Sequence, residues 1–408
     1  MVHSKKIKKN KKGLQAVILA AGASTRTYPL TVTMPKAMLK VANKTIIEHV
    51  LDQLDGIVKE AIIIVGYKKE KIMQLGARYN KITLKYVEQK EQLGTGHAVL
   101  QAEQYISDRF IVLNADDLIS KVDIKSLISH DYAVLAQKVD NPNNYGVFIT
   151  KSNKLVNVVE KPKTFISNIA NVAVYVFNKK IFDLIKKTEK TERREYELTD
   201  ALKKLARNND VYCEMIKDYW LPIGYAWDII KANEVLLSRI KASEIKGIVE
   251  KGATLKGIVC VGKGTIIKSG VYIEGPVVIG ENCKIGPNCY IRGSTSIGNN
   301  CHIGQAVELK NTIIFDKTNV AHLSYVGDSV IGNNSNLGAG TVTANLRHDN
   351  KNIRSAVKGL IIDTGRRKLG TIIGDNVHTG IHTSIYPGRK IWPDKTTLPG
   401  EIITKDVE

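Results

Sequence analysis

Short apolar runs alternate with amphipathic segments through the first 240 residues of the chain. Runs of strand length, bounded by turn residues, fall at residues 16–20, 61–65, 110–113, 133–135 and 172–177. Apolar residues at helical spacing occupy the segments 45–54, 96–105 and 198–205. This alternation predicts an α/β domain with a mostly parallel sheet that helices cover on both faces. Ligands of such sheets bind at the carboxyl ends of the strands.

From residue 249 the pattern changes to one aliphatic residue in every six. These positions are Val249, Leu255, Val261, Ile267, Ile273, Ile279, Ile285, Ile291, Ile297, Ile303 and Leu309. Neither a helix nor a single strand sustains this period. We therefore predict a parallel β-helix with about 18 residues per coil, in which the aliphatic column points inward and the stacked coils bury one continuous core.

The six-residue pattern is interrupted in the last hundred residues. Its phase shifts after Leu309, and it resumes at Ile331 and again at Ile373. Insertions that break the register of a β-helix project from it as loops. The longest, residues 346–368, is a candidate lid or a contact with a neighbouring subunit.

Composition and length indicate a globular protein of two domains. The chain has 408 residues, 43% of them hydrophobic and 25% charged, which excludes a disordered or collagenous chain. No apolar run approaches the roughly 18 residues of a membrane span. We expect the domains at residues 13–240 and 247–408.

Five cysteines, an odd number without a CxxC pair, argue against a disulfide framework or a zinc site. They favour a reducing compartment, and we expect the cytoplasm. Cys283 and Cys301 lie one predicted coil apart, and Cys289 occupies the equivalent place on a neighbouring face. We interpret these three as packed small hydrophobic residues.

The formal net charge of +20 raises nucleic acid or anionic lipid as a partner. Part of the excess is local, because residues 1–12 contain six lysines and no acid. We interpret this segment as a basic, solvated tail. The remaining excess can serve phosphate-bearing substrates, and since a nucleic-acid role rests on charge alone, we do not expect one.

The first predicted strand runs directly into a segment suited to phosphate binding, residues 19–26. A glycine and small residues after a strand let backbone N–H groups approach a phosphate, and Arg26 and Lys36 add fixed positive charge. Without those two cations an ordinary strand-to-helix connection would explain the segment equally well.

Three segments together resemble the sugar-1-phosphate nucleotidylyltransferases: LAAGASTRTYPLTVTMPKAML, EQKEQLGTGHAV and NADD. The resemblance implies a Rossmann-like nucleotidyltransferase domain in which Arg26 and Lys36 grip the triphosphate and Asp116 binds Mg²⁺. It also implies UTP binding by Leu19, Ala20, Ala21, Gly22, Gln89, Gly94 and Thr95. The sugar would be held by Gly146, Glu160, Lys161 and Asn171.

The chemistry of phosphoryl transfer agrees with this set, because it needs positioning and charge neutralisation more than covalent help. Mg²⁺ keeps several waters, so one or two carboxylates suffice to hold it. The alternative for Asp116 is a helix N-cap. Two departures from the family pattern stand out. Ser24 replaces the second loop glycine and must adopt a conformation that a Cβ tolerates. Pro222 stands where a second metal ligand is usual, and whether nearby Asp228 substitutes for it is left open.

In the second half, the segments AHLSYVGD and LGAGT resemble the acetyltransferase domain of bifunctional UDP-N-acetylglucosamine pyrophosphorylase/glucosamine-1-phosphate N-acetyltransferases. The resemblance implies a left-handed parallel β-helix that forms homotrimers, with active sites between neighbours. It implies that His322 is the general base. Arg292, Lys310, Tyr325, Asn336 and Lys351 would hold the amino-sugar phosphate, and Ala339 and Asn345 would contact acetyl-CoA.

A glucosamine ammonium must lose a proton before it can attack a thioester, and a neutral imidazole is well suited to accept it near pH 7. A lone histidine on a β-helix is otherwise more often structural. Leu346 departs from the bacterial enzymes, which usually carry an aromatic residue there.

We therefore predict a bifunctional enzyme that acetylates glucosamine 1-phosphate and couples the product to UTP. Two alternatives stay open. The first is a nucleotidylyltransferase for another sugar, such as glucose 1-phosphate, with a non-catalytic β-helix used for oligomerisation. The second is a non-catalytic assembly subunit, against which the retention of Arg26, Lys36, Asp116 and His322 speaks.

Overall fold

The computed structural model describes residues 13–192 and 194–408, so the predicted basic tail, residues 1–12, lies outside the described residues. Contacts divide the chain into two compact units. Unit 1 comprises Met1–Ala23 and Ile47–Trp220, and unit 2 comprises Ser24–Ile46 and Leu221–Glu408. This division differs from the expected segments 13–240 and 247–408, because two segments of the first half group with the β-helix.

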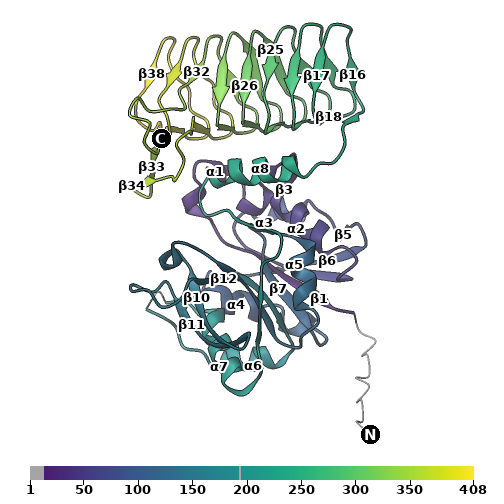
Figure 1. The fold of residues 1–408 in the computed structure, drawn as a ribbon, viewed down its shortest axis with the longest axis vertical. Helices are drawn as coiled ribbons and strands as arrows, with labels where there is room; N and C mark the ends of the chain where they lie inside the picture. The colour runs from purple at the N-terminus through teal and green to yellow at the C-terminus, as the bar shows by residue number, and fades with distance from the viewer. Residues whose placement is uncertain (1–12, 193) are drawn as a thin grey trace. The chain divides into compact units, whose positions relative to one another are not determined.

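Unit 1 is built on a ten-stranded mixed sheet in the order β10-β11-β13-β9-β12-β7-β1-β4-β6-β5 (Figure 1). Its strands are β1 (Gln15–Ala20), β4 (Glu60–Val65), β5 (Arg78–Tyr79), β6 (Ile82–Glu88), β7 (Phe110–Asn114), β9 (Ala133–Lys138), β10 (Gly146–Lys151), β11 (Lys154–Glu160), β12 (Ile169–Phe177) and β13 (Tyr212–Met215). The pair β8 (Asp117–Ile119) and β14 (Trp220–Pro222) forms a small second sheet. The helices are α2 (Ile46–Leu54), α3 (Lys69–Met73), α4 (Thr95–Leu100), α5 (Lys121–Leu127), α6 (Lys180–Lys186) and α7 (Leu198–Asn208).

The five predicted strands and three predicted helices of this half are all present. The helix expected over 96–105 is shorter, since α4 ends at Leu100 and a 3₁₀ turn, Glu103–Tyr105, follows. The prediction of a mostly parallel sheet holds for part of it: β1 pairs in parallel with β4 and β7, β4 with β6, and β9 with β13. Farther out, β12 runs antiparallel to β7 and β9. Sequence alternation cannot reveal such a reversal, because a buried strand looks the same in either direction.

The second half forms the predicted parallel β-helix, with three sheets that we call the first, second and third faces. The first face holds β15 (Glu244–Ile245), β18 (Val259–Val261), β21 (Val277–Ile279), β24 (Thr295–Ile297), β27 (Ile313–Ile314), β30 (Val330–Ile331), β35 (Ile372–Ile373) and β37 (Lys390–Ile391). The second holds β16 (Ile248–Val249), β19 (Ile266–Ile267), β22 (Lys284–Ile285), β25 (His302–Gln305), β28 (Asn319–His322) and β31 (Asn336–Leu337). The third holds β17 (Thr254–Lys256), β20 (Tyr272–Glu274), β23 (Tyr290–Ile291), β26 (Glu308–Lys310), β29 (Tyr325–Gly327), β32 (Val342–Thr343), β36 (Ser384–Ile385) and β38 (Ile402–Ile403).

The phase shifts of the sequence correspond to changes in coil length. Early coils are in 18-residue register, as in the pairing of Ile267 with Ile285. Ile297 pairs with Ile314 and Ile314 with Ile331, so each of these two coils is one residue shorter. Both deletions lie where the chain passes from the third face to the first. The insertion lies at the same kind of corner, and it carries the hairpin of β33 (Arg354–Val357) and β34 (Leu360–Asp363). The inward column continues through all of them.

Side chains that point outward from the first face are also buried, which the six-residue period does not predict. Ser296, Ile313, Val330, Ile372 and Lys390 are each at most 2% exposed. Helix α8 (Asp228–Ser238) lies beside this face (Figure 1). With α1 (Leu30–Thr33) and the hairpin β2 (Lys40–Val41)–β3 (Lys44–Thr45), it belongs to the same compact unit as the β-helix.

The interpretation of Cys283, Cys289 and Cys301 as packed core residues is confirmed. All three are at most 2% exposed and belong to the hydrophobic core of the β-helix. Across residues 13–192 and 194–408, no helix is both long and apolar enough to cross a bilayer.

Two candidate active sites

The predicted phosphate loop follows β1, whose carboxyl end lies between those of β4 and β7. Gly22 is exposed, and the space where its Cβ would stand holds no described atom within 4 Å. Ser24 adopts the left-handed α conformation, with φ 51° and ψ 47°. An L-residue reaches that region at a cost of roughly 1–2 kcal/mol, so the serine is tolerated where the family has glycine. The Ser24 carbonyl accepts hydrogen bonds from the hydroxyls of Thr27 and Thr31 at 2.6 and 2.9 Å, which fixes the turn.

The two predicted triphosphate cations have different surroundings within unit 2. Arg26 is exposed, and its Cζ lies 5.5 Å from the ring centroid of Tyr225. Lys36 is 8% exposed, and its Nζ donates to the Ile223 carbonyl at 2.6 Å. Both cations are therefore held by the segment that precedes α8.

Asp228 at the start of α8 fixes the same segment. Its Oδ2 accepts hydrogen bonds from the backbone N–H groups of Gly224 and Tyr225 at 2.9 and 2.7 Å. Burial raises the pKa of this carboxyl, while those hydrogen bonds and the charges of Lys36 and Arg366 lower it. The Asp228 carboxylate thus holds the backbone around Gly224 through Oδ2.

The residues predicted to recognise uracil meet at the end of β6. Gln89 is 5% exposed, and its Nε2 contacts the Gly94 carbonyl at 3.2 Å and His97 Nδ1 at 3.0 Å. Gly94 has φ 100°, and a Cβ there would stand 2.7 Å from the Tyr196 carbonyl, so only glycine fits. The Thr95 hydroxyl accepts the Leu198 N–H at 3.1 Å, at the start of α7. Sequence reasoning missed His97, although it lies within one of the quoted motifs.

Three of the four predicted sugar residues are adjacent on neighbouring strands. Gly146 is the register partner of Glu160, whose Oε2 lies 2.7 Å from the place of a Cβ on Gly146. Asn171 on β12 lies on the other side of Gly146, and its amide contacts the Tyr175 hydroxyl at 2.7 Å. Lys161 is exposed and its backbone N–H donates to the Tyr145 carbonyl. The strand order therefore brings together residues that are 25 positions apart.

Asp116 is half-buried in the turn between β7 and β8. The alternative of a helix N-cap is excluded, because α5 is capped by Ser120, whose hydroxyl accepts the Asp123 N–H at 3.2 Å. The described residues contain no cluster of three metal-ligating side chains. A single carboxylate at the carboxyl end of a central strand fits Mg²⁺, which takes one or two protein ligands together with substrate phosphates.

On the third face of the β-helix, the predicted amino-sugar cations are paired with carboxylates. Arg292 contacts Glu308 at 3.1 Å, and Lys310 contacts Asp328 at 3.0 Å. Tyr325 lies in the same sheet.

Asp328 joins the two predicted ligand sets of this domain. Asn345 Nδ2 donates to the Tyr325 hydroxyl at 3.1 Å and to Asp328 Oδ2 at 2.6 Å. Asp328, which is only 3% exposed, also binds Lys310. Sequence reasoning missed this organising role, although the residue closes the AHLSYVGD motif.

His322 is exposed at the end of β28. The Gly340 N–H donates to its backbone carbonyl at 3.2 Å, so Ala339 and Gly340 lie on the next coil at the same corner. Asn336 belongs to the second face, one coil beyond Asn319. Lys351 lies in the insertion, exposed, and no contact of its side chain with the other predicted ligands is found among the described residues.

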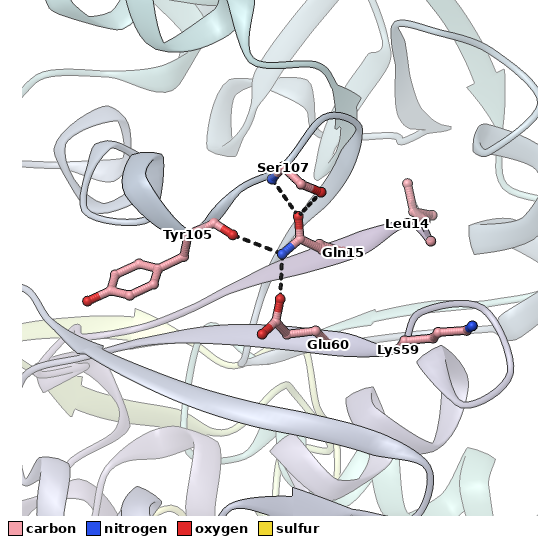
Figure 2. Close-up of a pocket in the computed structure, with 7 residues that line it drawn as sticks. Leu14, Gln15, Lys59, Glu60, Tyr105 and Ser107 are labelled. Atoms are coloured by element: carbon pink, nitrogen blue, oxygen red, sulfur yellow. Dashed lines mark hydrogen bonds between the residues drawn. The ribbon is translucent and has the colours of Figure 1, made fainter. Parts of the chain in front are cut away.

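A shallow pocket of about 340 Å³ lies at the opposite, amino end of the sheet in unit 1 and is lined by none of the predicted residues. Figure 2 shows Gln15 at its centre, with its amide nitrogen bonded to Glu60 and the Tyr105 carbonyl, and its oxygen bonded to Ser107. Its polar groups satisfy one another, which is the arrangement of a structural hydrogen-bond network.

Comparison with known proteins gives the family. The profile described as "Nucleotidyl transferase" matches residues 15–239, more than half of the chain. The chain belongs to the nucleotidyl transferase family. A second profile, "GMPPB C-terminal domain", matches residues 273–398 of the β-helix. A solved UDP-glucose pyrophosphorylase in complex with UDP-glucose aligns with 56% of this chain and 100% of its own, with a TM-score of 0.51 and 25% identity.

Relatives of this nucleotidyl transferase cover both domains. The "Bifunctional protein GlmU" of Methanococcus maripaludis strain C7 is 46% identical over 97% of this chain and 96% of its own length. The "Bifunctional sugar-1-phosphate nucleotidylyltransferase/acetyltransferase" of Sulfurisphaera tokodaii is 38% identical over 97% and 98%. The predictions of an enzyme with this α/β and β-helix pairing, and of its bifunctional family, are confirmed.

Proposed function

We propose that the chain acetylates glucosamine 1-phosphate with acetyl-CoA and then couples N-acetylglucosamine 1-phosphate to UTP, giving UDP-N-acetylglucosamine and pyrophosphate. The observation that carries this proposal is the similarity, over nearly the full length, to a relative named for both activities and to another named bifunctional. Motif residues for both reactions are also retained on the one chain.

For nucleotidylyl transfer, a phosphate oxygen of the sugar phosphate attacks the α-phosphorus of UTP, and pyrophosphate leaves. Arg26 and Lys36 neutralise the triphosphate and the pyrophosphate that forms. Asp116 would hold Mg²⁺, which supplies further charge neutralisation. Gly146, Glu160, Lys161 and Asn171 would bind the hexose, and Leu19 to Gly22 would offer backbone N–H groups to phosphate.

The hydrogen bonds of Gln89 suggest how the base is read. Both protons of its amide nitrogen point to Gly94 and His97. Among the described residues no donor contacts its Oε1, which therefore suits the N3–H of uracil. Cytosine carries an acceptor at that position and would face the same oxygen unfavourably.

For acetyl transfer, His322 takes a proton from the substrate ammonium, and the free amine attacks the thioester carbonyl. As the C–S bond breaks, the second proton lost by the nitrogen goes to the departing CoA thiolate. Arg292, Lys310 and Tyr325 would bind the sugar phosphate, and Glu308 and Asp328 orient the two cations. Asn336 and Lys351 would complete the sugar site. Ala339 and Asn345 would contact acetyl-CoA.

We further propose a homotrimer through the β-helix. Support comes from large apolar side chains that are exposed on its later coils, since exposed apolar patches mark interaction sites. They are Leu323, Val342, Ile381, Leu398 and Ile402, each 43–73% exposed. A neighbouring subunit would complete the acetyl-transfer site around Lys351. Since UTP and acetyl-CoA are cytoplasmic metabolites, we place the enzyme in the cytoplasm.

The full-length protein should be incubated with glucosamine 1-phosphate, acetyl-CoA, UTP and Mg²⁺, and the products identified by mass. We expect UDP-N-acetylglucosamine, and none when any substrate is left out. Removal of Mg²⁺ with a chelator should stop the process at N-acetylglucosamine 1-phosphate. Conversion of supplied N-acetylglucosamine 1-phosphate without any acetylation of glucosamine 1-phosphate would instead establish the monofunctional alternative.

A further inference from the structure

The two cations proposed to bind the triphosphate belong to the same compact unit as the β-helix. Residues 24–46, which carry Arg26 and Lys36, are separated in sequence from the rest of unit 2 by the segment Ile47–Trp220 of unit 1. Their contacts within unit 2 show how they are held.

A stack of rings connects Arg26 to the later coils of the β-helix. The Tyr225 ring beneath Arg26 stacks on Trp227, with the ring centroids 4.8 Å apart. On Trp227 lies the ammonium of Lys390, at 5.7 Å from the ring centroid. Lys390 points outward from the first face on β37 and is 2% exposed. Arg26 therefore rests on a platform whose base is a strand of the β-helix.

The segment around Lys36, residues 33–43, is bound directly to coil residues. Lys40 Nζ contacts both carboxylate oxygens of Asp316, at 2.8 and 2.6 Å. The Thr33 hydroxyl donates to Asp375 Oδ2 at 2.7 Å. Asn43 donates to the Ile297 carbonyl at 2.5 Å. The segment that carries the two cations is thus tied both to the ring platform and to anchors on three different coils.

Asn233 of α8 ties helix, hairpin and coil together. Its Oδ1 accepts the Ala42 N–H at 2.8 Å and the Ser296 hydroxyl at 3.0 Å, and its Nδ2 donates to the Ser294 carbonyl at 2.8 Å. The residue is fully buried. A buried amide with three satisfied hydrogen bonds is a specific connection, because leaving any one unpaired costs about 1–3 kcal/mol.

We propose that the β-helix positions Arg26 and Lys36 for nucleotidylyl transfer, with Asp316, Asp375 and Asn233 as positioning residues. The inference rests on the proposed function and adds to it a second role for the β-helix, one that is independent of acetyl transfer. None of the three residues is among those predicted to touch a substrate.

The anchors act on catalysis through geometry. Misplacement of a catalytic group by about 1 Å can lower a rate by about a hundredfold. Loss of the Lys40–Asp316 pair should therefore lower kcat for nucleotidylyl transfer and leave His322 and its surroundings unaffected. A purely structural role would lower both activities and the melting temperature together.

The test compares Lys40→Met with Lys40→Arg in the full-length protein. The matched control is Lys246→Met, which breaks the exposed pair of Lys246 and Glu244 in the same unit. In each protein, pyrophosphate release from UTP and N-acetylglucosamine 1-phosphate is measured beside thiol release from acetyl-CoA and glucosamine 1-phosphate. Melting temperature is recorded for all of them.

We expect Lys40→Met to lower kcat for nucleotidylyl transfer about tenfold or more, with acetyl transfer within twofold of wild type. Lys40→Arg should restore most of the rate, and Lys246→Met should match wild type. Unchanged nucleotidylyl transfer in Lys40→Met, or a parallel loss of both activities, would overturn the inference. A wild-type protein that lacks nucleotidylyl transfer would instead defeat the proposed function.

Discussion

The glutamine that we propose reads the base must itself be held in one orientation. Gln89 is buried at the end of β6, and its amide nitrogen contacts His97 Nδ1 at 3.0 Å. Gln101 contacts the opposite ring nitrogen of His97 at 3.2 Å and its backbone carbonyl at 3.1 Å. A neutral imidazole accepts a hydrogen bond at only one ring nitrogen, so with Nδ1 accepting from Gln89 the imidazole fixes that amide, while Gln101 donates to the His97 backbone carbonyl.

Replacing His97 should weaken recognition of uracil. In His97→Phe the amide of Gln89 loses one acceptor and can rotate, and a hydrogen bond of this kind contributes about 1 kcal/mol. We expect KM for UTP to rise about fivefold, and the preference for UTP over CTP to fall. Steady-state kinetics with both nucleotides measures this.

Gln101→Met provides the control for the His97 variant, because it leaves the contact between His97 and Gln89 in place. Its KM for UTP should change less than twofold. Equal nucleotide preference in His97→Phe and wild type would show that Gln89 is held by other groups.

The buried ammonium of Lys390 should make stability depend on pH. Burial lowers the pKa of Lys390, with Arg389 acting in the same direction and Asp406 and Glu408 opposing it. Between that lowered pKa and the ordinary value of 10.5, the unfolded chain binds more protons than the folded one. The contribution of Lys390 to the free energy of unfolding therefore rises with pH in this window.

Lys390→Met removes this titration. Urea unfolding of both proteins from pH 7 to 10.5 should show wild type gaining stability relative to the variant as pH rises. If the difference in free energy of unfolding between wild type and Lys390→Met stays constant over this range, Lys390 has the same pKa in the folded and the unfolded state.

At the scale of elements, the core of the β-helix is one aliphatic column that passes through coils of unequal length. Ile303 and Ile314 are both fully buried in this column, although the coil between Ile297 and Ile314 is one residue shorter than the earlier coils. Each inward residue packs between equivalents one coil above and below, so removing one leaves a cavity that the rigid stack cannot close.

Ile303→Ala should lower the free energy of unfolding by about 2–5 kcal/mol. Ile361→Ala on β34 is the matched control, because that side chain is 63% exposed and its loss should cost less than about 0.5 kcal/mol. Denaturant unfolding of the two variants gives the comparison. Similar losses in both would contradict the inward column.

The sequence allowed prediction of elements that rest on local periodicity. The strands of unit 1 follow from short apolar runs, and the column from Val249 to Leu309 follows from the period of six. Its first member, Val249, is 37% exposed on the first coil, so it is not part of the buried core. The burial of the outward side of the first face was not predicted. The pairs Ile313-Ile314, Val330-Ile331 and Ile372-Ile373 nevertheless place apolar residues on both sides of three of its strands. Such pairs indicate a strand buried on both faces, but they do not say which distant segment covers it.

The candidate sites were predictable where a motif is contiguous and less so where contacts are distant. Arg26, Gln89 and His322 lie in quoted motifs. Tyr225 and Asp316 do not, because their roles depend on the fold bringing them to residues 24–46. Asp328 could have been found, since a buried acid inside a motif with a nearby lysine indicates an ion pair.

At the scale of the whole molecule, we propose two reactions on one chain, with the residues for acetyl transfer in the β-helix. For each proposed reaction, one side chain is exposed, so replacing it with alanine leaves no cavity in a hydrophobic core. Arg26 serves the first motif and His322 the second, and both side chains are exposed. Their variants should fold as wild type does.

The most direct test measures both activities in His322→Ala and Arg26→Ala. General-base catalysis contributes about 10²–10⁴-fold, so His322→Ala should lose acetyl transfer by at least about a hundredfold while nucleotidylyl transfer stays within twofold of wild type. Arg26→Ala should show the reverse. An unchanged acetylation rate in His322→Ala would contradict the assignment of two active sites to this chain.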